Sequence, residues 1–249
     1  MSTTTIANNV ALITGANRGI GRAIAEALLE RGAAKIYATA RNLDSLKDLT
    51  QSYGDRVVAI ELDVTKEEQV AAAAQQAQDV GLLINNAGVV VGGGLDEMDI
   101  VSAARQEMEV NYFATLRLVQ QFSSTLKANG GGAIVNISSI AGLTNFPFYP
   151  TYSASKAAVH SLTQAGRALL ASQGTVVYGV YPGPVDTDMA RDIEMDKETP
   201  EAVAKAILDG LEAGVTDIFP DAFAEGFGQQ FHLSPKASEE QLAAMLAAA

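Results

Sequence analysis

The sequence contains no cysteine, only 2 histidines and only 7 prolines. The absence of cysteine excludes disulfide bonds and thiolate chemistry, and the two histidines lie too far apart to give a zinc-binding spacing, so we expect no metal. Hydrophobic residues make up 48% of the chain and charged residues 18%, which is a globular composition. We therefore expect the 249 residues to fold by burial alone as one domain.

Basic charge, a leader and long apolar runs are also lacking. The formal net charge of -12 makes the average field unfavourable for a nucleic-acid backbone or an anionic membrane surface. The segment from Met1 to Asn9 is rich in Ser, Thr and Asn and does not resemble a signal peptide, and no apolar run reaches membrane-spanning length. The sequence thus predicts a cytoplasmic protein with no nucleic-acid or membrane partner.

Short β-branched or apolar runs alternate with longer helical patterns, which predicts an α/β fold with a parallel sheet and helices on both faces. Helical spacing is clearest at 21–31, 66–78 and 102–127, and another helix is predicted to begin near Pro200. A substrate flap is expected at about 188–200 and a C-terminal extension at about 220–249. The seven predicted strands are Val10 to Thr14, Lys35 to Thr39, Val57 to Glu61, Leu82 to Asn85, Ala133 to Ser138, Val176 to Tyr181 and Thr216 to Phe219.

A glycine-rich turn follows the first predicted strand, with glycines at positions 15, 19 and 21. Such a strand-to-helix turn lets backbone N–H groups approach a pyrophosphate, which the helix N-terminus also favours. At the end of the second strand, where NAD enzymes carry a carboxylate, the chain has Ala40 and Arg41. Arg41, with Arg18 in the turn, suits a 2′-phosphate. The pattern predicts NADP(H) rather than NAD(H), with two solvated surface arginines as the alternative.

Tyr152 and Lys156 are four residues apart in a predicted helix, so their side chains share one face. A neighbouring ammonium would lower the pKa of the phenol toward the range of general acid–base catalysis. Ser139 follows the fifth strand and would hold a substrate carbonyl, with Ser138 as the competing candidate. Asn111 interrupts an apolar helix, so it has either a catalytic role or a satisfied place in the core.

Taken in order and spacing, these motifs resemble the short-chain dehydrogenase/reductase family over roughly residues 10 to 190. The resemblance is carried by Thr14 to Gly21, Asn85-Asn86-Ala87-Gly88, Ser139, Tyr152-x-x-x-Lys156 and Pro182-Gly183. It implies a single Rossmann domain over residues 1–249 and a catalytic tetrad of Asn111, Ser139, Tyr152 and Lys156. Within the tetrad, Lys156 would also hold the nicotinamide ribose, and Asn111 would position a water that links Lys156 to solvent.

The glycine turn, the arginines and the resemblance together give an expected set of cofactor contacts. Asp63 and Val64 match the pair that touches adenine, and Val185 and Thr187 match residues that hold the nicotinamide carboxamide. The full set is Gly15, Asn17, Arg18, Gly19, Ile20, Gly21, Arg41, Asp63, Val64, Asn86, Ala87, Gly88, Tyr152, Lys156, Pro182, Gly183, Val185 and Thr187.

The expected activity is NADP(H)-dependent reduction of a ketone or aldehyde, with hydride from nicotinamide C4 and Tyr152 as general acid and base. Phe146, Phe148 and Met189 would give the substrate an apolar wall, or else serve ordinary loop packing. A β-ketoacyl-carrier reductase is the alternative, although the acidic chain suits an acidic carrier protein poorly. A non-catalytic NADP(H)-binding sensor is the third hypothesis.

The expected assembly is a homo-oligomer. The helices 102–127 and 152–171 match those that pair across the common dimer of the family. The chain departs from many tetrameric members at Ile218-Phe219-Pro220-Asp221 and in its longer tail, which places tetramerisation in question.

Overall fold

The computed structural model describes residues 3–248. Residues 1 and 2, in the segment from Met1 to Asn9, and residue 249, in the predicted C-terminal extension, lie outside the described residues. A seven-stranded sheet with the order β3-β2-β1-β4-β5-β6-β7 runs through the molecule, and every pairing is parallel. This confirms the predicted doubly wound architecture. The strands are β1 (Val10–Thr14), β2 (Lys35–Ala40), β3 (Val57–Glu61), β4 (Leu82–Asn85), β5 (Gly132–Ile137), β6 (Thr175–Val180) and β7 (Asp217–Ile218).

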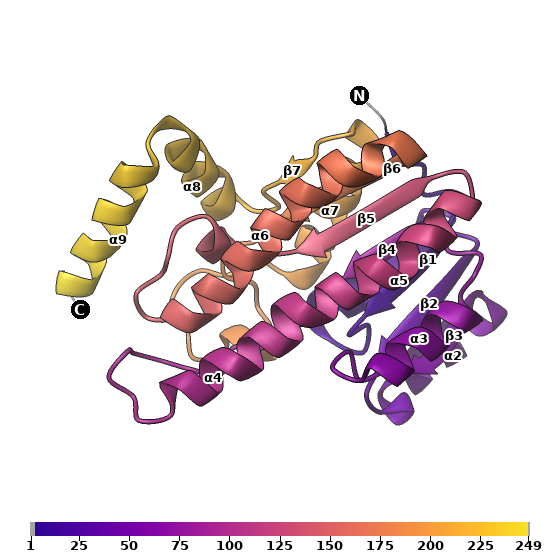
Figure 1. Ribbon diagram of the computed structural model, residues 1–249, viewed down its shortest axis with the longest axis horizontal. Helices are drawn as coiled ribbons and strands as arrows, with labels where there is room; N and C mark the ends of the chain where they lie inside the picture. The colour runs from indigo at the N-terminus through magenta and orange to yellow at the C-terminus, as the bar shows by residue number, and fades with distance from the viewer. Residues whose placement is uncertain (1–2, 249) are drawn as a thin grey trace.

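Helices cover both faces of the sheet (Figure 1). One layer holds α1 (Gly19–Glu30), α2 (Lys47–Tyr53) and α7 (Pro200–Ala213), and α1 packs directly on α7. The opposite layer holds α3 (Glu67–Gln76), α5 (Ala114–Ala128) and α6 (Pro150–Leu170). Within the described residues, no helix is long and apolar enough to cross a membrane.

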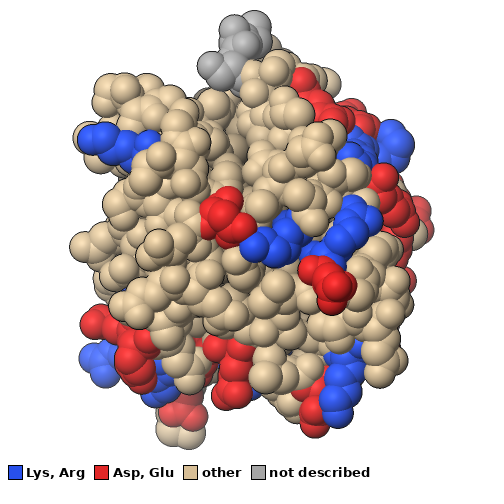
Figure 2. Space-filling view, turned by 90° about the vertical axis from the view of Figure 1, so that its right-hand side faces the viewer, with Lys and Arg blue, Asp and Glu red and all other residues tan. Residues whose placement is uncertain are grey.

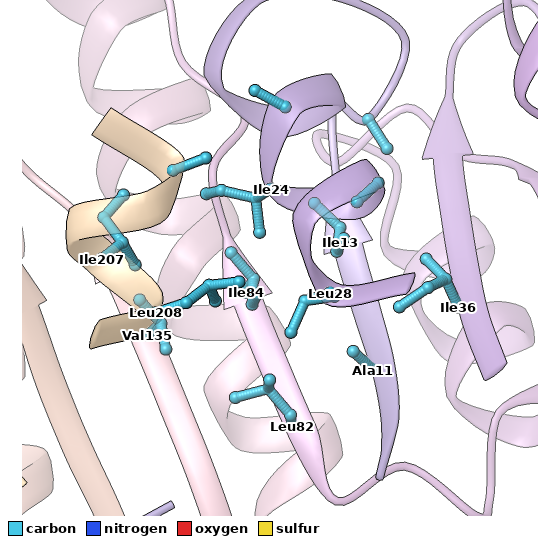
Figure 3. Close-up of a cluster of buried hydrophobic side chains, with 14 of the residues drawn as sticks. Ala11, Ile13, Ile24, Leu28, Ile36, Leu82, Ile84, Val135, Ile207 and Leu208 are labelled. Atoms are coloured by element: carbon cyan, nitrogen blue, oxygen red, sulfur yellow. The ribbon is translucent and has the colours of Figure 1, made fainter. Parts of the chain in front are cut away.

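The larger core lies between the sheet and the layer formed by α1 and α7 (Figure 3). Ile24 and Leu28 of α1 meet Ile207 and Leu208 of α7 above the central strands, and these four side chains are at most 1% exposed. Burial of such side chains from both sides explains the near-continuous apolar strand sequences. It also fixes the carboxyl ends of β1, β4, β5 and β6 at one edge of the sheet.

Three features of the fold differ from the sequence-based prediction. The expected helix over 102–127 is divided into α4 (Ile100–Glu107), a π-helical segment (Met108–Phe113) and α5. The helix α2 was not predicted, because its seven residues are too short for a clear periodicity. The strand β7 is only two residues long, since Pro220 follows shortly after it.

The C-terminal extension is helical and lies at one end of the molecule, beside the start of α6 (Figure 1). It forms α8 (Ala222–Leu233) and α9 (Pro235–Ala248), which pack on each other. Phe227 of α8 and Leu242 of α9 join a third apolar cluster with Ile140, just beyond β5. The extension therefore supports the loop that follows the end of β5.

Candidate active site

The glycine turn after β1 has the backbone shape that only glycine adopts easily. Gly15 and Gly19 have φ values of +67° and +54°, in the left-handed region. A Cβ atom on Gly21 would lie 2.3 Å from the carbonyl oxygen of Gly15, so α1 packs too closely on the turn for any side chain. These three positions leave the start of α1 open as a cradle for phosphate, and the turn fits a dinucleotide.

A hydrogen-bond network ties this turn to the end of β4. The Thr14 hydroxyl accepts hydrogen bonds from the backbone N–H groups of Asn86 (2.9 Å) and Ala87 (3.0 Å). In return, Asn86 Nδ2 donates to the carbonyl oxygens of Thr14 (2.8 Å) and Gly15 (3.2 Å). Sequence analysis gave Thr14 no role, although its position at the end of a buried strand, before the glycine turn, was a usable signal.

The two arginines expected at a 2′-phosphate both line the same cleft. Arg41 is exposed directly after β2. Arg18 donates a hydrogen bond to Asp188 Oδ2 at 2.5 Å, and Asp188 also pairs with Arg191 at 2.9 Å. Arg18 thus contacts the start of the predicted flap, a partner that the sequence gave no reason to expect.

Ser139 and Tyr152 meet at the floor of the cleft. Ser139 lies two residues beyond β5, and its hydroxyl accepts from the N–H of Ala141 (3.2 Å). Burial raises the pKa of Tyr152 to about 12, and the Ser139 hydroxyl has a smaller, opposite effect. The Ser138 hydroxyl instead donates to the carbonyl oxygen of Lys156 (3.0 Å) and is occupied within the fold. This geometry favours Ser139 over Ser138 as the substrate-binding serine.

Lys156 lies one turn of α6 beyond Tyr152, as the spacing predicts, with its Nζ atom 5.7 Å from the centre of the phenol ring. The Nζ atom donates to the carbonyl oxygen of Ile137 (2.8 Å). Burial lowers the pKa of Lys156 to about 8, because the apolar surroundings disfavour its charge. The pKa of Tyr152 is therefore raised rather than lowered as expected, because burial is the largest influence on it.

Asn111 lies in the π-helical segment, where the wider turn directs its buried side chain toward the end of β4. Its Oδ1 accepts from the N–H of Val89 (2.8 Å), and its Nδ2 donates to the carbonyl of Val89 (2.9 Å) and to Ser155 Oγ (2.8 Å). The amide is fully hydrogen-bonded within the protein. A Cβ on Gly88 would lie 3.2 Å from Asn111 Oδ1 and 3.5 Å from Lys156 Nζ, so Gly88 keeps these two groups close.

One cleft of about 1640 Å³ gathers nearly all the expected residues. Gly21 and Asn111 lie behind its surface, and every other expected catalytic, cofactor and substrate residue, including Phe146, Phe148 and Met189, lines it. The C-terminal extension adds side chains that sequence analysis missed, because nothing local in the chain shows that α8 and α9 return to the site. The extension contributes Phe223, Leu242 and Met245, and the predicted flap contributes Ile193 and Met195 in addition to Met189.

Comparison with known proteins gives consistent matches. The short chain dehydrogenase family model matches residues 9–198. A short-chain dehydrogenase from Burkholderia cenocepacia, solved in complex with NADP, has 43% identity and a TM-score of 0.90 over 96% of this chain and 99% of that one. An oxidoreductase of Staphylococcus saprophyticus is 32% identical over 82% of this chain and 92% of its own length. Ketoacyl reductase HetN of Nostoc is 31% identical over 86% of this chain and 79% of its own length.

These matches, with the glycine turn and the Ser139, Tyr152 and Lys156 cluster, show that the chain belongs to the short-chain dehydrogenase/reductase family. It is an oxidoreductase with a Rossmann-type fold.

Proposed function

We propose that the protein is an NADP(H)-dependent carbonyl reductase that acts reversibly as an alcohol dehydrogenase, with Tyr152 as its general acid and base. The observation that carries this proposal is that Ser139, Tyr152 and Lys156 line the same cleft, with Lys156 Nζ 5.7 Å from the centre of the Tyr152 ring. The raised pKa of Tyr152 keeps the phenol protonated at neutral pH, which is the form required for reduction.

Each site residue has a separate role in the proposed reduction. Ser139 holds the carbonyl oxygen, and Tyr152 donates its proton to that oxygen as the alcohol forms. The glycine turn would hold NADPH, which when bound would supply a hydride from nicotinamide C4 to the carbonyl carbon. Lys156 would hold the nicotinamide ribose beside Tyr152, and Asn111 holds Val89 in the segment that follows β4. The apolar wall from Phe146 onward excludes water from the reacting carbon.

The cofactor preference rests on Arg41 and Arg18 and on the NADP bound to the Burkholderia relative. Removal of a charge-assisted hydrogen bond from Arg41 should weaken NADPH binding about ten- to a hundredfold and leave NADH binding unchanged. Arg41→Ala, with the exposed Arg105→Ala as control, tests this by fluorescence titration of both cofactors. A wild-type preference for NADH would overturn the assignment.

The activity itself is tested by NADPH oxidation on a panel of apolar ketones and aldehydes. Tyr152→Phe should abolish turnover and leave NADPH affinity within about twofold of the wild type. Tyr53→Phe, the same change on the remote helix α2, serves as the control. Substantial activity in Tyr152→Phe would refute the role of Tyr152 as proton donor.

A second candidate function is reduction of β-ketoacyl groups on a carrier, which the similarity to ketoacyl reductase HetN favours. The net charge of -12 opposes docking of an acidic carrier. Figure 2 shows acidic and basic side chains interleaved over one face of the molecule, an arrangement that suits such a partner poorly. Inclusion of a β-ketoacyl thioester and its carrier-bound form in the same panel distinguishes the two activities.

A further inference from the structure

Glu107, the last residue of α4, is an ionisable side chain buried beside the active site that the proposed chemistry does not use. It is 0% exposed and does not line the cleft. Its Oε1 atom accepts hydrogen bonds from the backbone N–H groups of Val91 (2.8 Å) and Gly92 (3.2 Å). Its Oε2 atom is buried without a hydrogen-bond partner among the described residues. A buried carboxylate oxygen without a hydrogen-bond partner lowers the stability of the folded protein, so we expect Glu107 to have a role that offsets this cost.

The segment held by Glu107 packs against the first turn of α6. A Cβ on Gly92 would lie 3.1 Å from Thr151 Oγ1 and 3.0 Å from the Cβ of Ala103 in α4, so the backbone is wedged between the two helices. The Thr151 hydroxyl is also buried and without a partner in the described part of the chain. Thr151 directly precedes Tyr152. The Glu107 carboxylate is therefore linked to the helical turn that carries the catalytic phenol through the backbone of Gly92, which packs on Thr151.

Charge gives a second connection between the two residues. The negative charge of Glu107 adds to the main effect, burial, in raising the pKa of Tyr152, whereas the hydrogen bond with Ser139 opposes both. The groups that face Tyr152 are Glu107 from α4, Ser139 from the end of β5 and Lys156 from α6 itself. Glu107 is the anionic member of this set.

We propose that Glu107 is a positioning residue for Tyr152: it holds Val91 and Gly92 against the start of α6 and places a negative charge near the first turn of that helix, which carries Tyr152. The charge keeps Tyr152 in its protonated form, so it favours reduction and delays the oxidation of alcohol to higher pH. This inference rests on the proposed role of Tyr152 as acid and base.

Glu107→Gln tests the charge. The glutamine Oε1 atom can still accept from both N–H groups, so the tether is retained while the charge is removed. The pH profile of alcohol oxidation should shift toward lower pH, with KM for the substrate within about twofold of the wild type. Glu97→Gln is the matched control, since the exposed Glu97 accepts from the N–H of Gly93 (3.2 Å) in the same segment. An unchanged profile in Glu107→Gln would overturn the proposal.

Glu107→Ala tests the tether, because it leaves the N–H groups of Val91 and Gly92 without an acceptor. Amide hydrogen exchange at these two residues should accelerate, and kcat/KM should fall roughly tenfold, which Glu107→Gln should not reproduce. Equal exchange rates in Glu107→Ala and the wild type would contradict the holding role.

A readout that needs no carbonyl substrate separates this inference from the proposed function. The pKa of Tyr152 can be followed in the NADP-bound protein by the 13C shift of labelled tyrosine Cζ, assigned with Tyr152→Phe. Glu107→Gln should lower this pKa relative to the wild type and to Glu97→Gln. If no carbonyl compound is reduced, the proposed function fails, and this titration still decides whether Glu107 acts on Tyr152.

Discussion

Two buried threonines on adjacent strands give a sharp test of how the glycine turn is held. Thr14 and Thr39 are partners in the register of β1 and β2, and they are 1% and 0% exposed. The Thr14 hydroxyl accepts from Asn86 and Ala87, whereas the Thr39 hydroxyl has no hydrogen-bond partner within residues 3–248. Replacement of each threonine by the isosteric valine exchanges the hydroxyl for a methyl group. Comparison of the two variants therefore measures how much the hydrogen bonds of Thr14 contribute to the free energy of unfolding.

Thr14→Val leaves two backbone N–H groups without an acceptor at a partly buried site. Each unsatisfied donor costs about 1–3 kcal/mol, so we expect a loss of about 2–6 kcal/mol and a fall in Tm of about 4–24 °C. Thr39→Val removes a buried hydroxyl that makes no hydrogen bond, so its cost should be near zero or its effect stabilising by up to about 1 kcal/mol.

Urea unfolding and thermal melts of the two variants measure these differences, and NADPH titration measures the effect on the turn. Thr14→Val should also weaken NADPH binding, because the backbone of Asn86 and Ala87, which line the cleft beside the glycine turn, loses its acceptor. Equal destabilisation by Thr14→Val and Thr39→Val would refute the reasoning, since the two substitutions differ only in the hydrogen bonds removed.

Three further predictions concern the cradle, the catalytic lysine and the C-terminal helix. Gly21→Ala should reduce NADPH affinity more than about tenfold because its Cβ would lie 2.3 Å from the oxygen of Gly15, whereas Gly226→Ala, with nothing within 4 Å, should be neutral or stabilising in a thermal melt. Burial lowers the pKa of Lys156 from 10.5 to about 8, so between these pH values the unfolded chain binds more protons than the folded one. The free energy of unfolding should therefore rise with pH in this window. Denaturant titrations should show that Lys156→Met removes the rise. Leu242→Ala should raise KM for bulky apolar ketones more than for acetone, and an equal change for both would exclude α9 from the substrate wall.

Much of the fold could be predicted because its signals are local. β-branched runs, helical spacing and the glycine turn each depend on neighbouring residues, and the bounds of β1, β3 and β4 were predicted to the residue. The break between α4 and α5 was not predicted, because the apolar periodicity continues through the π-helical segment. The direction of the Tyr152 pKa was also wrong, since burial of the pair depends on how α6 packs.

The sequence by itself determined the family, the positions of the sheet-forming segments and most of the predicted site residues that line the cleft, because these follow from motifs and periodicities that are local in the chain. Only the tertiary structure distinguished Thr14 from Thr39, brought Leu242 to the site and joined Glu107 to the segment that packs on the start of α6. These relations join residues distant in the chain, and they depend on desolvation and on hydrogen-bond partners that no local pattern records.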